Sequence, residues 1–237
     1  MILLPAGDCA VVAQFEKKIS PEVNAKVSAL NSAVENAHIP GVTETLPTYA
    51  ALLIYYDPLV ITYDEICEKL KALSDIASAS SKSAYIYSIP VCYGGEFGED
   101  LDSVAEYAKI TPDEVIRRHS AKPYLIYMLG FLPGFSYLGG LDESIACPRL
   151  SSPRQRIEPG SVGIGGSQTG IYPIASPGGW RMIGRTPVRT YDPRKEDPIL
   201  YRAGDYIRFI PIDRTEYEKI ASEVEAGTYV CKREAVK

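Results

Sequence analysis

Hydrophobic residues in the first 75 positions follow two different spacings. Four short apolar runs predict strands, which lie at residues 2–4, 9–15, 42–46 and 49–56. Between the second and third runs, apolar residues recur every three or four positions and predict a helix with one apolar face, made of Val23, Val27, Leu30 and Val34. Ser20 and Pro21 mark its start as N-cap and first helical residue. Thr62 and Glu65 form a capping box that begins a second helix, which carries Ile66, Leu70 and Leu73.

The order strand, strand, helix, strand, strand, helix is typical of a compact α+β domain. The stretch SDIASASSKS at residues 74–83 is half serine and lacks apolar periodicity, which is typical of a linker. We therefore predict a small α+β domain over residues 1–80 and a second domain over residues 84–237.

The second domain shows a different pattern. A strand is predicted at 84–93, followed by a glycine-rich turn and two short helices, of which the second begins at Thr111 and Pro112 and ends near His119. From 124 to 211 short apolar runs are separated by Gly and Pro without a long helical pattern, and a last helix fits 213–226. This pattern favours a mainly-β domain with short helices, either a barrel or a sandwich.

The composition is typical of a globular protein with two domains. A chain of 237 residues with 46% hydrophobic residues can bury the cores of two modest domains. The N-terminal residues lack a basic leader, and no apolar segment approaches the roughly 20 residues of a membrane span, so we expect a cytoplasmic protein without a membrane anchor. Five dispersed cysteines without a C-x-x-C pair, together with only two histidines, predict reduced thiols and no metal site.

Charge is distributed unevenly along the chain. The net charge of -5 predicts no nucleic-acid partner, because it supplies no general attraction to a polyanion. Residues 144–191, however, contain six arginines, no lysine and the single acid Glu158. Arginine binds carboxylate or phosphate through two parallel hydrogen bonds, so this region predicts anion recognition by Arg154, Arg156 and Arg185. The alternative is that some of these surface arginines merely pair with acids of the N-terminal domain or of the C-terminal helix.

The same region supplies the other candidate ligand-binding residues. The neutral polar candidates are Gln168, Tyr172 and Ser176, and Trp180 is either a pocket wall or a buried core ring. Gly178 and Gly179 either expose main-chain N–H groups to a ligand or simply form turns of a barrel. Outside the region, His119 is either a structural residue at a helix end or the one candidate general acid or base.

Two motifs for nucleotide binding and one for a catalytic serine are only partly matched by the sequence. The glycines of 165–170 continue as Ile171-Tyr172 where a phosphate-binding loop needs Lys-Ser or Lys-Thr. The stretch from Gly163 to Gln168 lacks the last glycine of a dinucleotide fingerprint. The stretch 134–139 is one residue too long for a G-x-S-x-G nucleophile elbow. A self-contained nucleotide or serine-hydrolase site is therefore not predicted.

Four longer motifs together resemble a known family. They are VCYGGEFGEDL (91–101), LGFLPGFSYLGGL (129–141), PRLSSPRQRIEPGSVGIGG (148–166) and QTGIYPIASPGGWRMIGRTP (168–187). The chain resembles, over nearly its whole length, the KipI or allophanate hydrolase subunit 1 family, whose bacterial members include the B-type subunit of 5-oxoprolinase. The resemblance implies that the second domain is a cyclophilin-like β-barrel.

The resemblance also implies an activity and partners. It implies one component of a 5-oxoprolinase complex that opens 5-oxoproline to glutamate with ATP. The chain is then inactive without a KipA-like partner (allophanate hydrolase subunit 2, the C-type subunit of 5-oxoprolinase) and a LamB/YcsF-like partner (the A-type subunit). ATP is used by the complex, and no cofactor is assigned to this chain. The small carboxylate or lactam substrate would meet the arginine-lined pocket near the partner subunit.

Two alternatives remain open at this point. The family also includes an inhibitor of a sporulation histidine kinase, which would make the chain a regulatory binding protein with a kinase as its partner. Similar modules form the carboxyltransferase part of urea carboxylases, which would place the chain in a urea and allophanate pathway. The residues alone exclude neither.

Overall fold

The computed structural model of the protein describes residues 1–18, 20–76 and 84–236. The chain divides into two compact units, Met1–Lys82 and Ser83–Lys237. The described residues leave out 77–83. This range contains the greater part of the serine-rich stretch and residue 80, the predicted end of the first domain. The residue limits of the predicted domains therefore stay a prediction.

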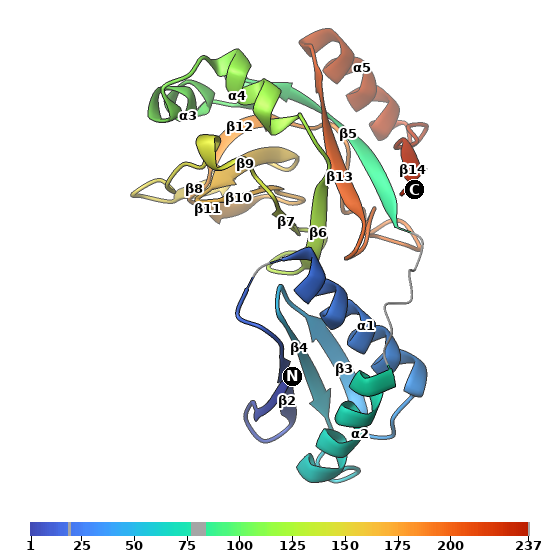
Figure 1. The fold of residues 1–237 in the computed structure, drawn as a ribbon. Coiled ribbons are helices and arrows are strands. Elements are labelled where there is room, and N and C mark those ends of the chain that lie inside the picture. The colour runs from blue at the N-terminus through green and yellow to red at the C-terminus, as the bar shows by residue number, and fades with distance from the viewer. Residues whose placement is uncertain (19, 77–83, 237) are drawn as a thin grey trace. The chain divides into compact units, whose positions relative to one another are not determined.

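The first unit is a four-stranded antiparallel sheet with two helices. Its elements are β1 (Ile2–Pro5), β2 (Ala10–Gln14), α1 (Pro21–Ala37), β3 (Val42–Pro47), β4 (Ala51–Tyr56) and α2 (Tyr63–Ile76). The strands lie in the order β1-β2-β4-β3, and both helices pack on the sheet (Figure 1). This is the predicted order of elements.

Local capping explains where the two helices begin. The Ser20 side chain accepts a hydrogen bond from the Val23 N–H at 3.3 Å, and Pro21 follows as the first helical residue. At α2 the Glu65 carboxylate accepts from the Thr62 N–H at 2.9 Å, and the Thr62 hydroxyl oxygen accepts from the Glu65 N–H. The predicted N-cap and capping box are confirmed.

The core of the first unit is aliphatic. Its members come from the inner face of the sheet and from the apolar faces of the two helices, and they include Val11, Val27, Leu30, Val34, Leu52, Ile54, Ile66 and Leu70. The predicted helical faces are therefore the ones that are buried. Regular spacing of apolar residues is enough to position both helices on the sheet.

The second unit contains the remaining elements. In chain order they are β5 (Tyr85–Tyr93), η1 (Gly95–Phe97), α3 (Leu101–Ala108), α4 (Pro112–His119), β6 (Tyr124–Leu129), β7 (Ser136–Gly139), η2 (Glu143–Ile145), β8 (Arg154–Ile157), β9 (Ser161–Gly165), β10 (Gln168–Ile171), β11 (Ser176–Gly178), β12 (Arg181–Arg185), β13 (Tyr206–Ile212), α5 (Arg214–Glu225) and β14 (Arg233–Ala235). Short strands, short helices and the helix at the end of the pattern appear where the sequence predicts them, whereas β14, which follows that helix, was not predicted.

Seven strands of the described residues close into a barrel in the order β5-β12-β9-β10-β7-β6-β13. The strand pattern had left a barrel and a sandwich open. The ring closes where Gly184 and Arg185 of β12 pair with Tyr93 and Cys92 of β5. The two strands β8 and β11 form a separate small sheet. The second unit is therefore a closed barrel with helices, while the cyclophilin-like name stays an expectation.

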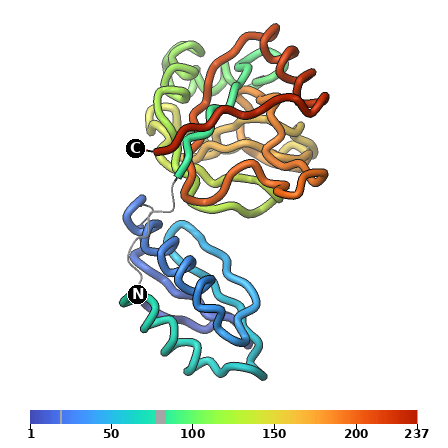
Figure 2. Tube along the Cα trace, turned by 90° about the vertical axis from the view of Figure 1, so that its right-hand side faces the viewer, coloured from blue at the N-terminus to red at the C-terminus, as the bar shows by residue number. Residues whose placement is uncertain are grey.

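Strand β5 is shared by three neighbours. It pairs in parallel with β13 over its length, with β12 at its C-terminal end, and with β14 at its N-terminal end. Figure 2 shows the red C-terminal segment returning beside the green start of the barrel unit. The start of β5 and strand β14 thus lie side by side.

The helices among the described residues include none that is long and apolar enough to span a lipid bilayer.

Candidate functional site

Three of the predicted residues, Arg154, Arg156 and Arg185, line one small cleft of about 70 Å³ in the barrel unit. Strands β8 and β12 supply the arginines, and the turn that contains η1 supplies the facing wall. The remaining lining residues are Glu96, Phe97, Glu99, Ile157, Glu158, Ser161 and Met182. The fold therefore brings together the arginines that the sequence had placed some 30 positions apart.

Asp100 holds one side of this cleft in place. Its side chain is almost fully buried and accepts two hydrogen bonds, from the Arg154 Nη2 at 2.9 Å and from the Met182 N–H at 2.7 Å. The Asp100 N–H donates to the Met182 carbonyl oxygen at 2.9 Å. One carboxylate thus joins the start of α3, strand β12 and the arginine of β8, which orients Arg154 before any ligand is present.

Arg154 is a paired arginine. Its Nε also lies 2.9 Å from the Glu99 carboxylate. Burial alone would lower the pKa of Arg154, but the hydrogen bond and charge of Asp100, reinforced by Glu99, outweigh burial and raise that pKa above its ordinary value. Arg154 therefore stays charged and is held by two acids.

The other acids of the cleft are also engaged. Arg156 donates from Nε to the Glu158 carboxylate at 2.7 Å, and this hydrogen bond lowers the pKa of Glu158. The Glu96 carboxylate forms an ion pair with the Arg214 guanidinium at 2.6 Å. Each of the three lining glutamates is thus held by an arginine other than Arg185.

Arg185 is different from its neighbours. Its side chain forms no hydrogen bond or ion pair with any residue that the structure describes, and its Nε is buried without a partner. The guanidinium carbon lies 5.8 Å from the centre of the Phe97 ring, which is within cation–π distance. A half-buried guanidinium without a carboxylate partner has unused donors, and those donors are available to an anion in the cleft.

Below the cleft lies a small aromatic core. Ile157 and Met182 line the cleft and also pack with Phe135, Tyr172 and Trp180. Trp180 is 4% exposed and Tyr172 is 3% exposed, so both rings are buried. A Cβ on Gly165 would lie 2.3 Å from the Trp180 ring, so glycine is required there. The two rings support the floor of the cleft without lining it, and their role as pocket walls stays a prediction.

The remaining candidates lie around this aromatic core. Ser176 pairs with Ile157 between β11 and β8, and its buried hydroxyl has no partner among the described residues. Gly178 lies opposite Arg154, and a Cβ there would come within 2.6 Å of the Tyr172 hydroxyl. Gly179 accepts a hydrogen bond from the Leu150 N–H, and Gln168 begins β10 opposite Gly165. None of the four lines the cleft, so their substrate contacts stay a prediction.

His119 lies at the end of α4 inside the barrel core and is fully buried. Its ring stacks on Phe209 with the ring centres 4.5 Å apart. Both ring nitrogens have partners at 2.8 Å, the Tyr93 hydroxyl at Nδ1 and the Thr169 hydroxyl at Nε2. Because His119 lines neither described pocket, the structure supports its structural interpretation more than its interpretation as an acid or base.

The hydrogen-bond network fixes the protonation of this histidine. The Thr169 hydroxyl donates its one proton to the Gly163 carbonyl at 3.0 Å, so Nε2 of His119 must be the donor to Thr169. Nδ1 then accepts from the Tyr93 hydroxyl. Burial lowers the pKa of His119 to about 3, so the ring is neutral at physiological pH.

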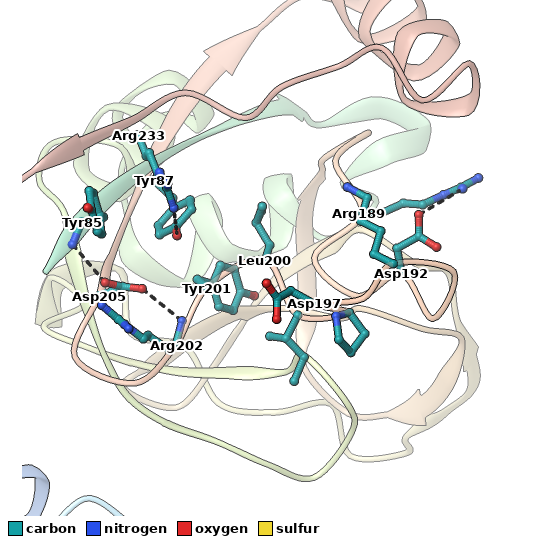
Figure 3. A pocket seen from close by; sticks show the side chains of 13 residues that line it. Tyr85, Tyr87, Arg189, Asp192, Asp197, Leu200, Tyr201, Arg202, Asp205 and Arg233 are labelled. Carbon is teal, nitrogen blue, oxygen red and sulfur yellow. Dashed lines mark hydrogen bonds and ion pairs between the residues drawn. The ribbon is translucent and has the colours of Figure 1, made fainter. Parts of the chain in front are cut away.

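A larger pocket of about 560 Å³ lies elsewhere in the barrel unit (Figure 3). It is lined by the start of β5, by Arg233 of β14 and by the segment 189–205, and it contains none of the predicted site residues. Over the described parts of the chain, no group of three or more His, Cys, Asp or Glu side chains is arranged to hold a metal ion.

Residues 1–201 match the family described as carboxyltransferase domain, subdomain C and D. The chain belongs to this family. The B-type subunit of 5-oxoprolinase from Bacillus subtilis (strain 168) is 41% identical over 229 residues, which cover 92% of this chain and 95% of the relative. The corresponding 5-oxoprolinase subunit from Escherichia coli O157:H7 is 38% identical over 206 residues, which cover 86% of this chain and 93% of the relative. The resemblance drawn from the four motifs is confirmed.

A crystal structure of the urea carboxylase of Kluyveromyces lactis shows the same fold with a TM-score of 0.79 and 21% sequence identity. The similarity covers 99% of this chain and 24% of the urea carboxylase chain. At this identity the comparison shows the fold alone.

Sequence reasoning missed the residues that shape the cleft from the opposite side. Asp100, Glu99 and Phe97 come from the motif VCYGGEFGEDL, which carried the resemblance without supplying a candidate residue. The sequence did offer one signal for Asp100, because this acid directly precedes the first residue of α3. An aspartate at a helix start is expected to accept hydrogen bonds from main-chain N–H groups. Here its side chain accepts instead from β8 and β12.

Proposed function

We propose that this chain is one component of an ATP-dependent 5-oxoprolinase complex that converts 5-oxoproline to glutamate. Support comes from relatives named as the B-type subunit of 5-oxoprolinase, of which the Bacillus subtilis protein is matched over 95% of its length. We assign the chain two partners, a KipA-like chain and a LamB/YcsF-like chain, and we expect no turnover without them. The barrel belongs, in this proposal, to the cyclophilin-like type.

The cleft around Arg185 is the proposed site for the substrate carboxylate or for a phosphorylated intermediate. The observation that carries this proposal is the unpaired guanidinium of Arg185 beside three glutamates that are already paired. A cleft of about 70 Å³ admits only a small group, which suits one carboxylate or one phosphoryl group rather than a whole cofactor. Arg154, oriented by Asp100, would form the second side of the site.

The charges around the cleft set the kind of recognition that is expected. Arg154, Arg156, Arg185 and Arg214 balance Glu96, Glu99, Glu158 and Asp100, so the formal charge of the surroundings is zero. An anion is then bound by the directed donors of Arg185 rather than by a general positive field. Substrate affinity should accordingly depend only weakly on ionic strength.

The decisive test of the activity uses the assembled complex. The chain is purified with its companion subunits, and glutamate release is measured with ATP and 5-oxoproline, with urea and with allophanate as alternative substrates. We expect glutamate from 5-oxoproline only, and none when this chain is omitted. Failure to release glutamate in the complete mixture would overturn the 5-oxoprolinase proposal.

Replacing Arg185 tests the cleft itself. For Arg185→Gln we expect the KM for 5-oxoproline to rise about tenfold or more, because a directed, charge-assisted contact to the carboxylate is lost. The matched control is Arg208→Gln on β13, since Arg208 is also partly exposed and pairs with Glu234 away from the cleft. Unchanged kinetics for Arg185→Gln in a correctly assembled complex would show that Arg185 has only a structural role.

A further inference from the structure

The larger pocket of the barrel unit has no part in the site described above. At about 560 Å³ it is eight times the volume of the Arg185 cleft and falls within the range of about 300–1,000 Å³ that is typical of small-molecule sites. Tyr87 and Tyr201 form a buried aromatic floor, with ring centres 6.1 Å apart and an edge-to-face arrangement. The pocket is therefore large enough for a ligand with both an apolar body and a polar end.

Two of the three carboxylates in this pocket are already engaged. The buried Asp205 accepts a hydrogen bond from the Tyr85 N–H at 2.9 Å and another from the Arg202 N–H at 3.1 Å (Figure 3). Both oxygens of its carboxylate are therefore bonded to main-chain N–H groups. Asp192 is held by two hydrogen bonds from Arg194, which lower the pKa of Asp192 well below its ordinary value. Both acids therefore build the walls of the pocket.

The cations of the pocket are less fully paired. Arg189 is joined to Glu225, but Arg233 forms no ion pair with a carboxylate of the described residues: its Nη1 donates to the Tyr87 hydroxyl at 3.3 Å, and its guanidinium lies over the Tyr85 ring at 4.6 Å. The side chain of Lys195 forms no hydrogen bond or ion pair within the described part of the chain. Arg233 and Lys195 thus supply positive charge that no ion pair among the described residues neutralises.

The arrangement of Tyr85 and Arg233 gives a flat surface beside that positive charge. Aromatic rings and guanidinium groups stack readily on nucleobases, which is the usual means of holding a base without reading its edge. Asp197 is the lining carboxylate that forms no hydrogen bond or ion pair within the described ranges. Protein sites for Mg²⁺ commonly use one or two carboxylates together with the phosphates of a nucleotide, so a larger acidic cluster is not needed.

We propose that this second pocket binds a nucleoside di- or triphosphate with Mg²⁺. The base stacks on the surface made by Tyr85 and Arg233, the phosphates lie toward Lys195 and Arg233, and Asp197 faces the cation. This inference rests on the proposed function, because it assigns the ATP of that reaction to a pocket in this chain. The chain would then carry two separate sites, a small one for a carboxylate and a large one for a nucleotide.

Direct binding tests the proposal without relying on turnover. Calorimetry with the purified chain, repeated with the assembled complex, uses MgADP as the probe and adenosine, inorganic triphosphate and 5-oxoproline as comparison ligands. We expect MgADP to bind more tightly than adenosine or triphosphate alone, because base and phosphate contacts are both required. Triphosphate binding as tight as that of MgADP would overturn the nucleoside assignment.

Variants locate the binding in this pocket. Lys195→Gln and Arg233→Gln should each weaken MgADP binding about tenfold, and Tyr85→Ala should weaken MgADP while changing triphosphate little. The matched control is again Arg208→Gln, since Arg208 contacts β14 through Glu234 but lies outside the pocket, and its affinity for MgADP should be unchanged. Equal binding by Arg233→Gln and the control would overturn the proposal.

Failure of this inference can be told apart from failure of the proposed function. A complex that releases glutamate from 5-oxoproline, while neither the chain nor the complex loses MgADP affinity in the Lys195 and Arg233 variants, overturns only the nucleotide pocket. A chain that binds MgADP through Arg233, in a complex that leaves 5-oxoproline intact, supports the pocket and overturns the 5-oxoprolinase assignment.

Discussion

The two units of this protein bury different kinds of side chain. Among the described residues, the first unit buries two polar side chains, Ser20 and Asn24, whereas the barrel unit buries ten: Asp100, His119, Ser136, Ser161, Thr169, Ser176, Thr186, Thr190, Asp192 and Asp205. The first unit is held by aliphatic contacts between regular elements. The barrel unit also depends on hydrogen bonds between segments far apart in the sequence, and the same contacts orient its arginines.

The contrast indicates which unit can hold a functional site. Buried polar groups are costly unless they are paired, so a region that contains many of them is tightly specified in geometry. Asp100 is an example, since one carboxylate fixes both Arg154 and the main chain of β12. Changes at four residues, His119, Asp100, Leu30 and Thr62, test this contrast between the units.

The largest expected effect is a dependence of barrel stability on pH through His119. Its pKa is about 3 in the folded protein and about 6.5 when unfolded, so the unfolded chain binds a proton that the folded barrel excludes. Stability is fully present above pH 6.5 and falls as the pH is lowered toward 3, by on the order of 5 kcal/mol. The single tryptophan, Trp180, lies in the barrel unit, so its fluorescence during urea unfolding at each pH reports the change.

The control for this experiment is His119→Gln, which retains a polar side chain but cannot titrate. Its unfolding free energy should be lower than that of the original protein at pH 7, and the difference between the two proteins should shrink as the pH falls to about 3. Parallel pH profiles for the two proteins would show that the histidine makes no contribution.

A smaller effect is expected from Asp100→Ala. This change leaves Arg154 without its buried partner and the Met182 N–H without an acceptor, which should cost about 3 kcal/mol of barrel stability. The measurement is urea unfolding followed by Trp180 fluorescence for the barrel unit and by far-ultraviolet circular dichroism for the whole chain. Asp100→Asn retains one acceptor and should cost less.

Leu30→Ala in the first unit is the matched comparison for that experiment. Leu30 is 1% exposed, and removing its side chain should also cost about 3 kcal/mol. The loss should appear in circular dichroism at lower urea while the Trp180 transition keeps its midpoint. If both variants shift both signals together, the two units unfold as one and the comparison between them fails.

The smallest effect is expected from Thr62→Ala, which removes the capping box at the start of α2. Because the hydroxyl and main chain of Thr62 exchange hydrogen bonds with Glu65 at an exposed helix end, the loss should be about 1 kcal/mol. Circular dichroism during thermal unfolding measures it. A loss as large as that of Leu30→Ala would show that local capping matters as much to the first unit as a buried residue of its core.

The starts of helices and the helix faces that are buried follow from short stretches of the sequence alone. The starts of α1, α2 and α4 are marked by Ser20, Thr62 and Thr111, whose caps depend on neighbours only three residues away. Apolar spacing likewise determined which helix faces are buried in the first unit. The arginine-rich region could be recognised from composition alone, because it is defined by the number of arginines between residues 144 and 191.

Which arginine lacks an acidic partner among the described residues depends on the tertiary fold. Asp100 and Arg154 are 54 residues apart, and Arg233 and Tyr87 are 146 residues apart, so neither contact follows from local pattern. Arg154, Arg156 and Arg185 look alike in sequence, yet acids hold the first two, and the third has no ion-pair partner among the residues that the structure describes. The Asp100–Arg154 ion pair needs side chains from distant segments to meet within about 4 Å, and the fold of the barrel unit sets that distance, whereas Arg156 pairs locally with Glu158, two residues away.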